Sequence, residues 1–188
     1  TGGPCAGKTE VISMLDGEYE QHIEVVPEAA RLLIDAGFPM PDHDMPWTQE
    51  WQDKFQETIL PMQMVLEDSA IARSRRLGKN LIICDRGLLD GAAYTEGGVE
   101  AFTEKFGLDL VEATERYESV IHLESVAASL PDAYEAEQRI EHLDIARQLE
   151  EKTKQAWRHH HAWTFVPAGE SFDEKLLAVR SLVEQSIF

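Results

Sequence analysis

The fold of this chain is decided by its first residues, Gly2-Gly3-Pro4-Cys5-Ala6-Gly7-Lys8-Thr9. They match G-x-x-x-x-G-K-[ST] at every fixed position, a pattern typical of a phosphate-binding P-loop. The fixed glycines are needed because backbone N–H groups must curl closely around the phosphates. Lys8 then reaches the β- and γ-phosphates, and the hydroxyl of Thr9 binds Mg²⁺. The eight residues therefore predict a site for ATP with Mg²⁺.

The segments on either side of the loop are predicted by its usual context. A helix is expected over residues 9–15, with its stop at Asp16-Gly17. The start of this helix adds a partial positive charge to the anion site. Because a P-loop lies between a strand and a helix, we also expect an apolar strand upstream of Thr1.

Composition indicates an ordinary globular chain. Its 188 residues, 43% of them apolar, fit one P-loop domain spanning the whole sequence. No apolar run is long enough to span a membrane, and two cysteines suit a reducing compartment, so we expect a cytoplasmic protein.

The charge of the chain restricts its partners. A formal net charge of −18 argues against binding to nucleic acid or an anionic membrane, because the overall field repels polyanions. A nucleotide must then be held by local cations, and the expected partner is a small-molecule acceptor. The sequence is also compatible with a homodimer.

Apolar runs alternate with helical stretches along the chain. This alternation favours an α/β fold, a three-layer P-loop arrangement with a parallel sheet, counted as five strands with the one upstream of Thr1. The remaining strands are expected at Ile23 to Val26, Leu81 to Cys84, Val120 to Leu123 and Trp163 to Val166. Long helices are expected over residues 48–77, interrupted or kinked at Pro61, and over 138–158, which would form a helical lid.

The second strand ends next to a carboxylate and a guanidinium. Glu28 and Arg31 would lie at the carboxyl edge of the sheet, beside the P-loop. There, Glu28 can accept the proton of an acceptor hydroxyl, and Arg31 can pair with Glu28 or with phosphate. Alternatively, Glu28 only suits the start of a helix.

The third strand is followed by Asp85 and Arg86, a Walker B pattern. Asp85 would organise the water shell of Mg²⁺. Motor ATPases place a second carboxylate after this position, whereas Arg86 suits phosphate oxygens, which favours a phosphotransferase. The alternative for Asp85 is a helix cap.

Polar side chains recur within the long helix 48–77. Gln56, Gln63 and Glu67 are spaced by seven and four residues, so they share one face. An amide on this face could read the hydrogen-bonding edge of a substrate. A solvated flank explains the spacing equally well.

The stretch 138–158 carries several basic residues that suit a lid. Arg139 and Arg147 would close onto the charge that develops on the transferred phosphoryl group and exclude water. The alternative is a surface helix with i,i+4 ion pairs.

The last strand is followed by Pro167 and Ala168, where P-loop kinases wrap backbone around adenine. The alternative is an ordinary turn from strand to helix.

The order of these motifs resembles one family over nearly the whole chain. G-G-P-x-A-G-K-T is followed by V-P-E-A-A-R, F-Q and C-D-R-G-L-L-D-G-A-A-Y. This order is similar to the AAA-type ATPase domain shared by the kinase half of bacterial NadR and the TRPL-translocation-defect protein. The resemblance implies a kinase fold related to thymidylate and deoxynucleoside kinases, with ATP and Mg²⁺.

Residue roles also follow from the resemblance. Glu28 and Asp90 look like acceptor-side carboxylates, and Gln56 is similar to the base-reading glutamine of deoxynucleoside kinases. In NadR the acceptor is nicotinamide riboside, but the motifs matched here are those of the kinase half alone, so the acceptor does not carry over.

The leading hypothesis is a Mg-ATP-dependent kinase acting on a hydroxyl of a nucleoside-like metabolite. Lys8, Arg86 and the lid arginines would stabilise the transferring charge. The alternative is a regulatory nucleotide-binding module without an acceptor, in which occupancy changes a partner surface.

Overall fold

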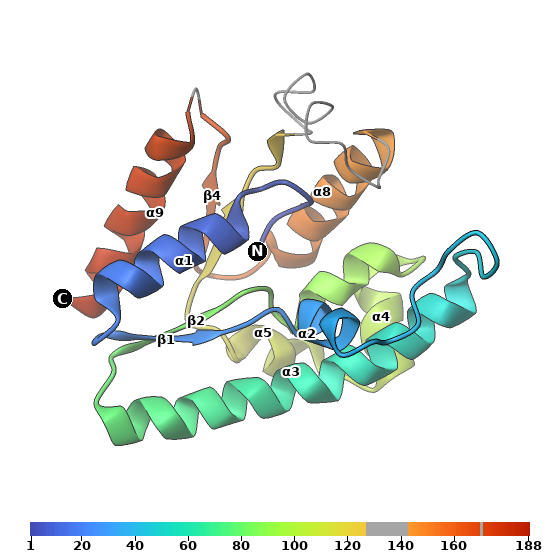
Figure 1. The fold of residues 1–188 in the computed structure, drawn as a ribbon, viewed down its shortest axis with the longest axis horizontal. Coiled ribbons are helices and arrows are strands. Elements are labelled where there is room, and N and C mark those ends of the chain that lie inside the picture. Colours follow the sequence, from blue (N-terminus) through green and yellow to red (C-terminus); the bar gives the residue numbers. More distant parts are fainter. Residues whose placement is uncertain (127–142, 170) are drawn as a thin grey trace.

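The computed structural model of the chain, which describes residues 1–126, 143–169 and 171–188, has an α/β fold (Figure 1). The four expected strands are confirmed residue by residue as β1 (Ile23–Val26), β2 (Leu81–Cys84), β3 (Val120–Leu123) and β4 (Trp163–Val166). The helices are α1 (Lys8–Tyr19), α2 (Ala29–Asp35), α3 (Gln49–Leu77), the 3₁₀ helix η1 (Leu88–Tyr94), α4 (Gly98–Phe106), α5 (Leu110–Glu115), α8 (Leu143–Trp157) and α9 (Phe172–Ile187).

The strands are parallel and pair two by two. β1 pairs with β2, with Ile23 opposite Leu81, and β3 pairs with β4. The expected single sheet of five strands is not confirmed, since the described residues form two sheets of two strands. Thr1 lies along β3: its amino group donates to the carbonyl of Ile121 at 2.9 Å, and its carbonyl accepts from the N–H of Leu123 at 2.9 Å.

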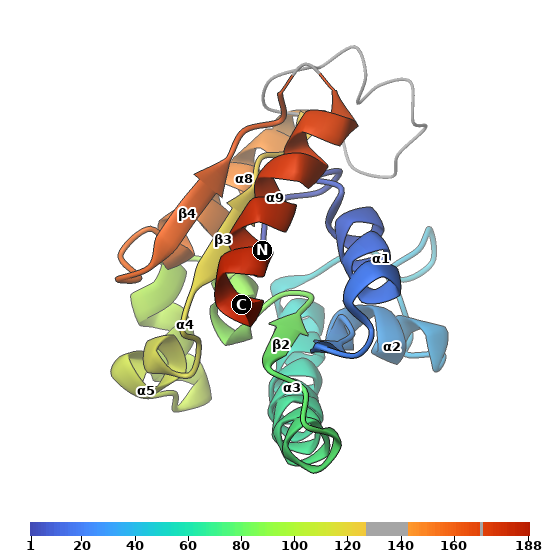
Figure 2. The same cartoon turned by 90° about the vertical axis from the view of Figure 1, so that its left-hand side faces the viewer.

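Helices cover both faces of the strands (Figure 2). On one face, α1 and α9 bury Val11, Leu15 and Val183 together with the strand residues Ile23 and Leu123. On the other face, α3, η1, α4, α5 and α8 share a second core, of which Phe102 and Trp157 are the largest buried members. Both sheets contact the first core, so the strands form the middle of three layers.

Helix α1 is longer than expected. The stop at Asp16-Gly17 is wrong, because the helix continues to Tyr19. Val11, Leu15 and Tyr19 are buried at a spacing of four residues, and the hydroxyl of Tyr19 donates to Glu184 Oε1 on α9 at 2.6 Å. Packing of this face therefore outweighs the cost of one glycine within a helix.

Helix α3 begins as expected but is not interrupted. Thr48 caps it, with Oγ1 accepting the N–H of Trp51 at 3.1 Å. The helix continues through Pro61, whose exposed ring contacts solvent. Of the expected helix 138–158, residues 143–157 form α8, and residues 138–142 lie outside the described residues. No described helix has the length and apolar character needed to cross a membrane.

Candidate nucleotide and acceptor site

The P-loop is held from outside through its carbonyl groups. Because C=O and N–H point in opposite directions across a trans peptide, outward carbonyls turn the following N–H groups inward. The three outward contacts are Ser125 Oγ to the carbonyl of Pro4, the N–H of Val126 to the carbonyl of Cys5 at 3.4 Å, and Lys175 Nζ to the carbonyl of Ala6 at 3.1 Å. The N–H groups of Cys5, Ala6 and Gly7 therefore face the inside of the loop, as an anion site requires.

Besides Gly2, two residues of the loop have left-handed backbone. Gly7, with φ 78°, is the N-cap of α1, and Cys5 has φ 59°. Left-handed residues in such a loop curve consecutive N–H groups into a concave cradle. The cradle leads directly into the N-terminus of α1, so the dipole of this helix adds to the anion site.

Lys8 folds back onto this loop. Its Nζ donates to the carbonyls of Gly2 at 3.0 Å and Gly3 at 2.9 Å. Burial, and then repulsion from Arg86, lower the pKa of Lys8 to about 8. The amine at the phosphate site therefore titrates close to physiological pH.

We expect nucleotide affinity to fall as pH rises through about 8. Bound phosphates favour the ammonium form of Lys8, so binding above pH 8 must take up a proton. At pH 9 the affinity for Mg-ADP should be about tenfold lower than at pH 7. Isothermal titration calorimetry in buffers of different ionisation enthalpy should show proton uptake at pH 9 and almost none at pH 7. An affinity that is flat across this range would contradict the prediction.

Asp85 is buried directly after β2, and one of its carboxylate oxygens has no hydrogen bond to a described residue. The residue is 7% exposed, and Oδ1 has no hydrogen bond to any described residue. Burial, and then repulsion from Glu28, raise the pKa of Asp85 above its usual range. A buried carboxylate oxygen without a donor is costly, and a Mg²⁺ ion bound to it would remove that cost. Asp85, with the hydroxyl of Thr9 on the first turn of α1, therefore fits a magnesium site.

Arg86 joins three parts of the site. It has left-handed backbone, with φ 73°. Its Nε donates to Glu28 Oε1 at 2.6 Å, and one terminal nitrogen donates to Asp90 Oδ1 at 3.3 Å and to the carbonyl of Gly2 at 3.5 Å. The predicted Glu28, Arg86 and Asp90 thus meet at the P-loop.

Asp90 and Glu28 differ in their surroundings. Asp90 is 3% exposed and also accepts from the hydroxyl of Thr1, the N–H of Gly87 at 2.9 Å and Trp157 Nε1 at 3.0 Å. Burial raises the pKa of Asp90, but Arg86 and these donors outweigh it and hold that pKa below its usual value. Glu28 is only half-buried and lines the cleft. Of the two carboxylates, Glu28 is therefore the one that an acceptor can approach.

A buried network lies behind Arg86. Gln63 Nε2 donates to the carbonyl of Arg86 at 3.3 Å and to Glu67 Oε1 at 2.8 Å. The hydroxyl of Tyr117 donates to the same oxygen and accepts the N–H of Leu88, both at 2.8 Å. The expected shared face of α3 is confirmed, and the solvated-flank alternative is wrong because Gln63 and Glu67 are each 3% exposed.

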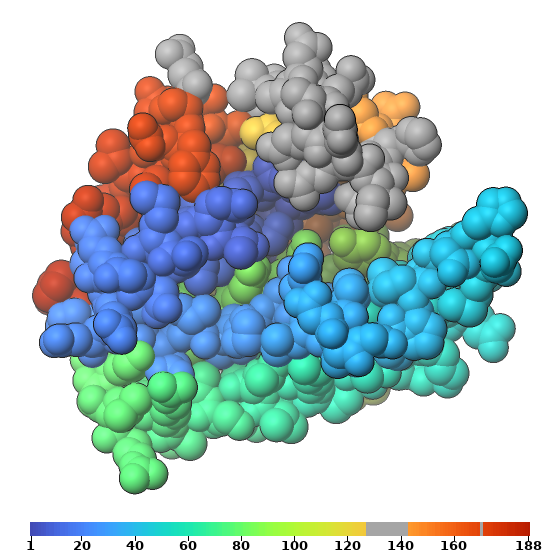
Figure 3. All heavy atoms as spheres, viewed as in Figure 1, coloured from blue at the N-terminus to red at the C-terminus, as the bar shows by residue number. Residues whose placement is uncertain are grey.

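One long cleft of about 2020 Å³ connects the P-loop with the N-terminal half of α3. Figure 3 shows the surface hollowed between the P-loop and the segment around α2. At the far end, the rings of Trp51 and Phe55 stack with centroids 4.9 Å apart, and Gln56 is buried beside them. The other lining residues at this end include Met40, Trp47 and Gln52.

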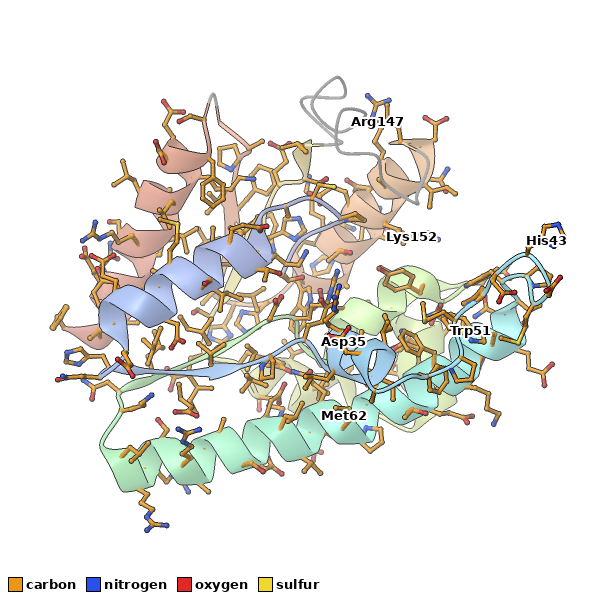
Figure 4. All side chains as sticks on the ribbon, viewed as in Figure 1. Asp35, His43, Trp51, Met62, Arg147 and Lys152 are labelled. Carbon is orange, nitrogen blue, oxygen red and sulfur yellow. The ribbon has the colours of Figure 1, made fainter. Side chains whose placement is uncertain are left out.

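The remaining predicted residues lie at varying distances from this cleft. Arg31 lines it but is exposed and donates to Asp35 at 3.0 Å. Arg147 is exposed near the start of α8, whereas Lys152 lines the cleft further along the helix (Figure 4). Arg139 lies outside the described residues.

The adenine-side residues Pro167 and Ala168 follow β4. Ala168 lines the cleft, and its N–H donates to Glu124 Oε2 at 2.8 Å. Pro167 is exposed. Together with Phe172 at the start of α9, Ala168 forms the end of the cleft opposite the aromatic end.

Comparison with known proteins supports the assignment of a P-loop nucleotide site. A family model described as an AAA domain matches residues 1–175, so the chain belongs to this AAA-domain family. No curated protein matches the chain. A solved structure of deoxyadenosine kinase from M. mycoides with bound dCTP is similar at a TM-score of 0.51 and 14% identity, covering 96% of this chain and 95% of that one.

The family and the fold together define the class of protein. The AAA-domain match and the P-loop place the chain among the P-loop kinases and NTPases. The likeness to deoxyadenosine kinase confirms the α/β P-loop fold. The narrower resemblance to NadR and the TRPL-translocation-defect protein is not confirmed by these comparisons.

Proposed function

We propose that this protein is a Mg-ATP-dependent kinase that phosphorylates a hydroxyl group of an uncharged, nucleoside-like molecule. The observation that carries the proposal is the placement of Arg86 between the P-loop and Glu28, inside one cleft. A hydrolase of the motor type needs a carboxylate at this position to polarise water. Here the residue after Asp85 is instead the cation Arg86, bonded to the carboxylate of Glu28. This pair suits transfer of a phosphoryl group to the hydroxyl of a second substrate.

The aromatic end of the cleft supports a flat, uncharged acceptor. Trp51 and Phe55 provide stacking surface, and Gln52 and Gln56 provide buried amides that can donate and accept. Arg31 is the cation of α2 at this end, and it is already paired with Asp35. A nucleoside presents a flat base of this kind, whereas the phosphate of a nucleoside monophosphate would have to displace Asp35 from Arg31 or engage Lys152.

Each residue near Arg86 has a role in this proposal. Lys8 and Arg86 bind the phosphate oxygens, while Glu28 orients the acceptor hydroxyl and accepts its proton. Thr9 and Asp85 hold Mg²⁺, which when bound neutralises charge on the phosphates. Because the acceptor of NadR does not carry over to this chain, nicotinamide riboside enters only as one compound of the test panel.

Acceptor-dependent ADP release tests the proposal. We expect one member of a panel of nucleosides, nucleoside monophosphates and nicotinamide riboside to raise ADP release well above the rate without acceptor. The Lys8→Ala variant, which lacks the phosphate-binding amine, should show no such increase. Tight nucleotide binding without acceptor-dependent turnover would overturn the kinase assignment in favour of a regulatory nucleotide-binding module.

A further inference from the structure

A buried carboxylate on α8 binds the P-loop from the side opposite Lys8. Glu150 is 2% exposed, and its Oε2 accepts the N–H of Gly3 at 2.8 Å. Its other oxygen, Oε1, lies 2.9 Å from Nε2 of His122, a β3 residue that is fully buried. The carboxylate therefore connects α8, β3 and the P-loop.

This contact explains why position 3 is glycine, although the P-loop pattern allows any residue there. A Cβ atom at Gly3 would lie 2.6 Å from Glu150 Oε2 and 3.0 Å from the Cα of Glu150. The second of these atoms is backbone and cannot move aside as the end of a side chain can. The close packing of Glu150 therefore requires glycine at position 3.

The hydrogen bond to Glu150 also sets the direction of the peptide between Gly2 and Gly3, to which both Lys8 and Arg86 donate. In the trans peptide between Gly2 and Gly3, the carbonyl points away from the N–H that Glu150 holds. On that side, the carbonyl of Gly2 accepts from Lys8 Nζ at 3.0 Å and from Arg86 at 3.5 Å. Because glycines flank this peptide, and Gly2 has φ 143°, side-chain sterics do not fix its direction, which depends on these hydrogen bonds and on the packing of Gly2 against β3.

We propose that Glu150 is a positioning residue for nucleotide binding. By holding the N–H of Gly3, it keeps the carbonyl of Gly2 facing Lys8 and Arg86, and so fixes both cations at the phosphate site. His122 holds the other carboxylate oxygen in place. This role deepens the proposed function, on which it rests for the phosphate-binding part played by the two cations.

The electrostatics of Glu150 agree with this role. Burial raises the pKa of its carboxyl group, but the hydrogen bonds to His122 and to the N–H of Gly3 outweigh burial and hold that pKa below its usual value. Glu150 is therefore ionised at neutral pH. A bond from an N–H to an ionised acceptor is stronger than one between neutral groups.

The test compares Glu150→Ala with a matched variant of the same helix. Thr153→Val changes a residue that is equally buried, but whose hydroxyl, among the described residues, bonds within α8, to the carbonyl of Leu149 at 2.8 Å. We expect Glu150→Ala to weaken Mg-ADP binding at least about tenfold, measured by calorimetry well below the melting temperature, since a charge-assisted hydrogen bond is lost. Thr153→Val should lower the melting temperature but bind Mg-ADP within about twofold of wild type.

Two further variants separate positioning from folding. Glu150→Gln keeps an oxygen for the N–H of Gly3, and its amide can donate to the other tautomer of His122, so it should restore most of the affinity. His122→Phe keeps an aromatic ring beside Trp163 and Phe165 but removes the hydrogen bond to Glu150, and it should weaken binding less than Glu150→Ala.

The contrary outcomes are distinct. Equal affinity losses in Glu150→Ala and Thr153→Val would overturn the positioning role, as would a Glu150→Gln variant no better than Glu150→Ala. A wild-type protein that binds Mg-ADP but phosphorylates no acceptor would instead overturn the kinase assignment. The role of Glu150 would still be decided by the Mg-ADP affinities of its variants.

Discussion

Replacing Arg86 with alanine should lower the acceptor-dependent kcat about 1000-fold. The guanidinium bridges Glu28, Asp90 and the carbonyl of Gly2, so it lies where charge would develop on a transferred phosphoryl group. Arginine groups that stabilise this charge contribute about 10³-fold or more to phosphoryl transfer. Single-turnover measurements with saturating Mg-ATP separate this effect on transfer from effects on binding.

A lysine at the same position is the informative control. Arg86→Lys keeps the positive charge but cannot bind Glu28 and Asp90 simultaneously through a planar fork. It should recover some of the lost rate and remain at least about tenfold below wild type. Because either change disturbs a buried ion pair, the melting temperature of each variant must be measured alongside. An Arg86→Ala enzyme with more than a tenth of the wild-type kcat would exclude Arg86 from the transfer step.

Replacing Gly2 with alanine should destabilise the fold by about 3 kcal/mol, from the strain of left-handed backbone combined with overpacking. Gly2 has φ 143°, and a Cβ atom there would lie 2.3 Å from the backbone oxygen of Leu123 in β3. The backbone would have to move where the P-loop meets β3. Chemical denaturation of the variant measures the change in the free energy of unfolding.

Replacing Gly17 with alanine should change the free energy of unfolding in the opposite direction. Gly17 lies within α1, and a Cβ atom there would meet nothing within 4 Å. Gly17→Ala should therefore stabilise the protein by about 0.5–1 kcal/mol through helix propensity. If both glycine variants changed stability by similar amounts, the clash with β3 would not explain the requirement for glycine at position 2.

The elements that could be predicted from sequence are those with a local signal. Each strand is a short apolar run between polar residues or turns, and all four were placed correctly. The end of α1 was placed incorrectly because its final turn depends on the bond of Tyr19 to Glu184, which is 165 residues away. The pairing of strands into two sheets rather than one also had no local signal.

The candidate site also divides into residues with a local sequence signal and residues whose role depends on distant partners. The P-loop, Asp85 and Arg86 follow from short motifs, and the shared edge of parallel strands places Glu28 beside the P-loop. The partner of Glu28 does not follow from the sequence, which offered Arg31, whereas Arg86 binds Glu28 and Arg31 binds Asp35. Glu150 and Trp157 were missed because their partners, Gly3 and Asp90, are 147 and 67 residues away. On sequence alone both read as ordinary members of an amphipathic helix, which shows no sign of what it packs against.

Helix α8 also constrains which changes in length the chain can accept. Glu150 and Trp157 are seven residues apart, two turns or about 10 Å along the helix, and they face the same side, where one holds Gly3 and the other holds Asp90. Inserting or deleting one residue between them would rotate one contact by about 100° relative to the other. Exposed residues in this interval, such as Glu151 and Gln155, can vary in type. Among relatives that keep both contacts, this stretch should therefore vary in sequence without varying in length.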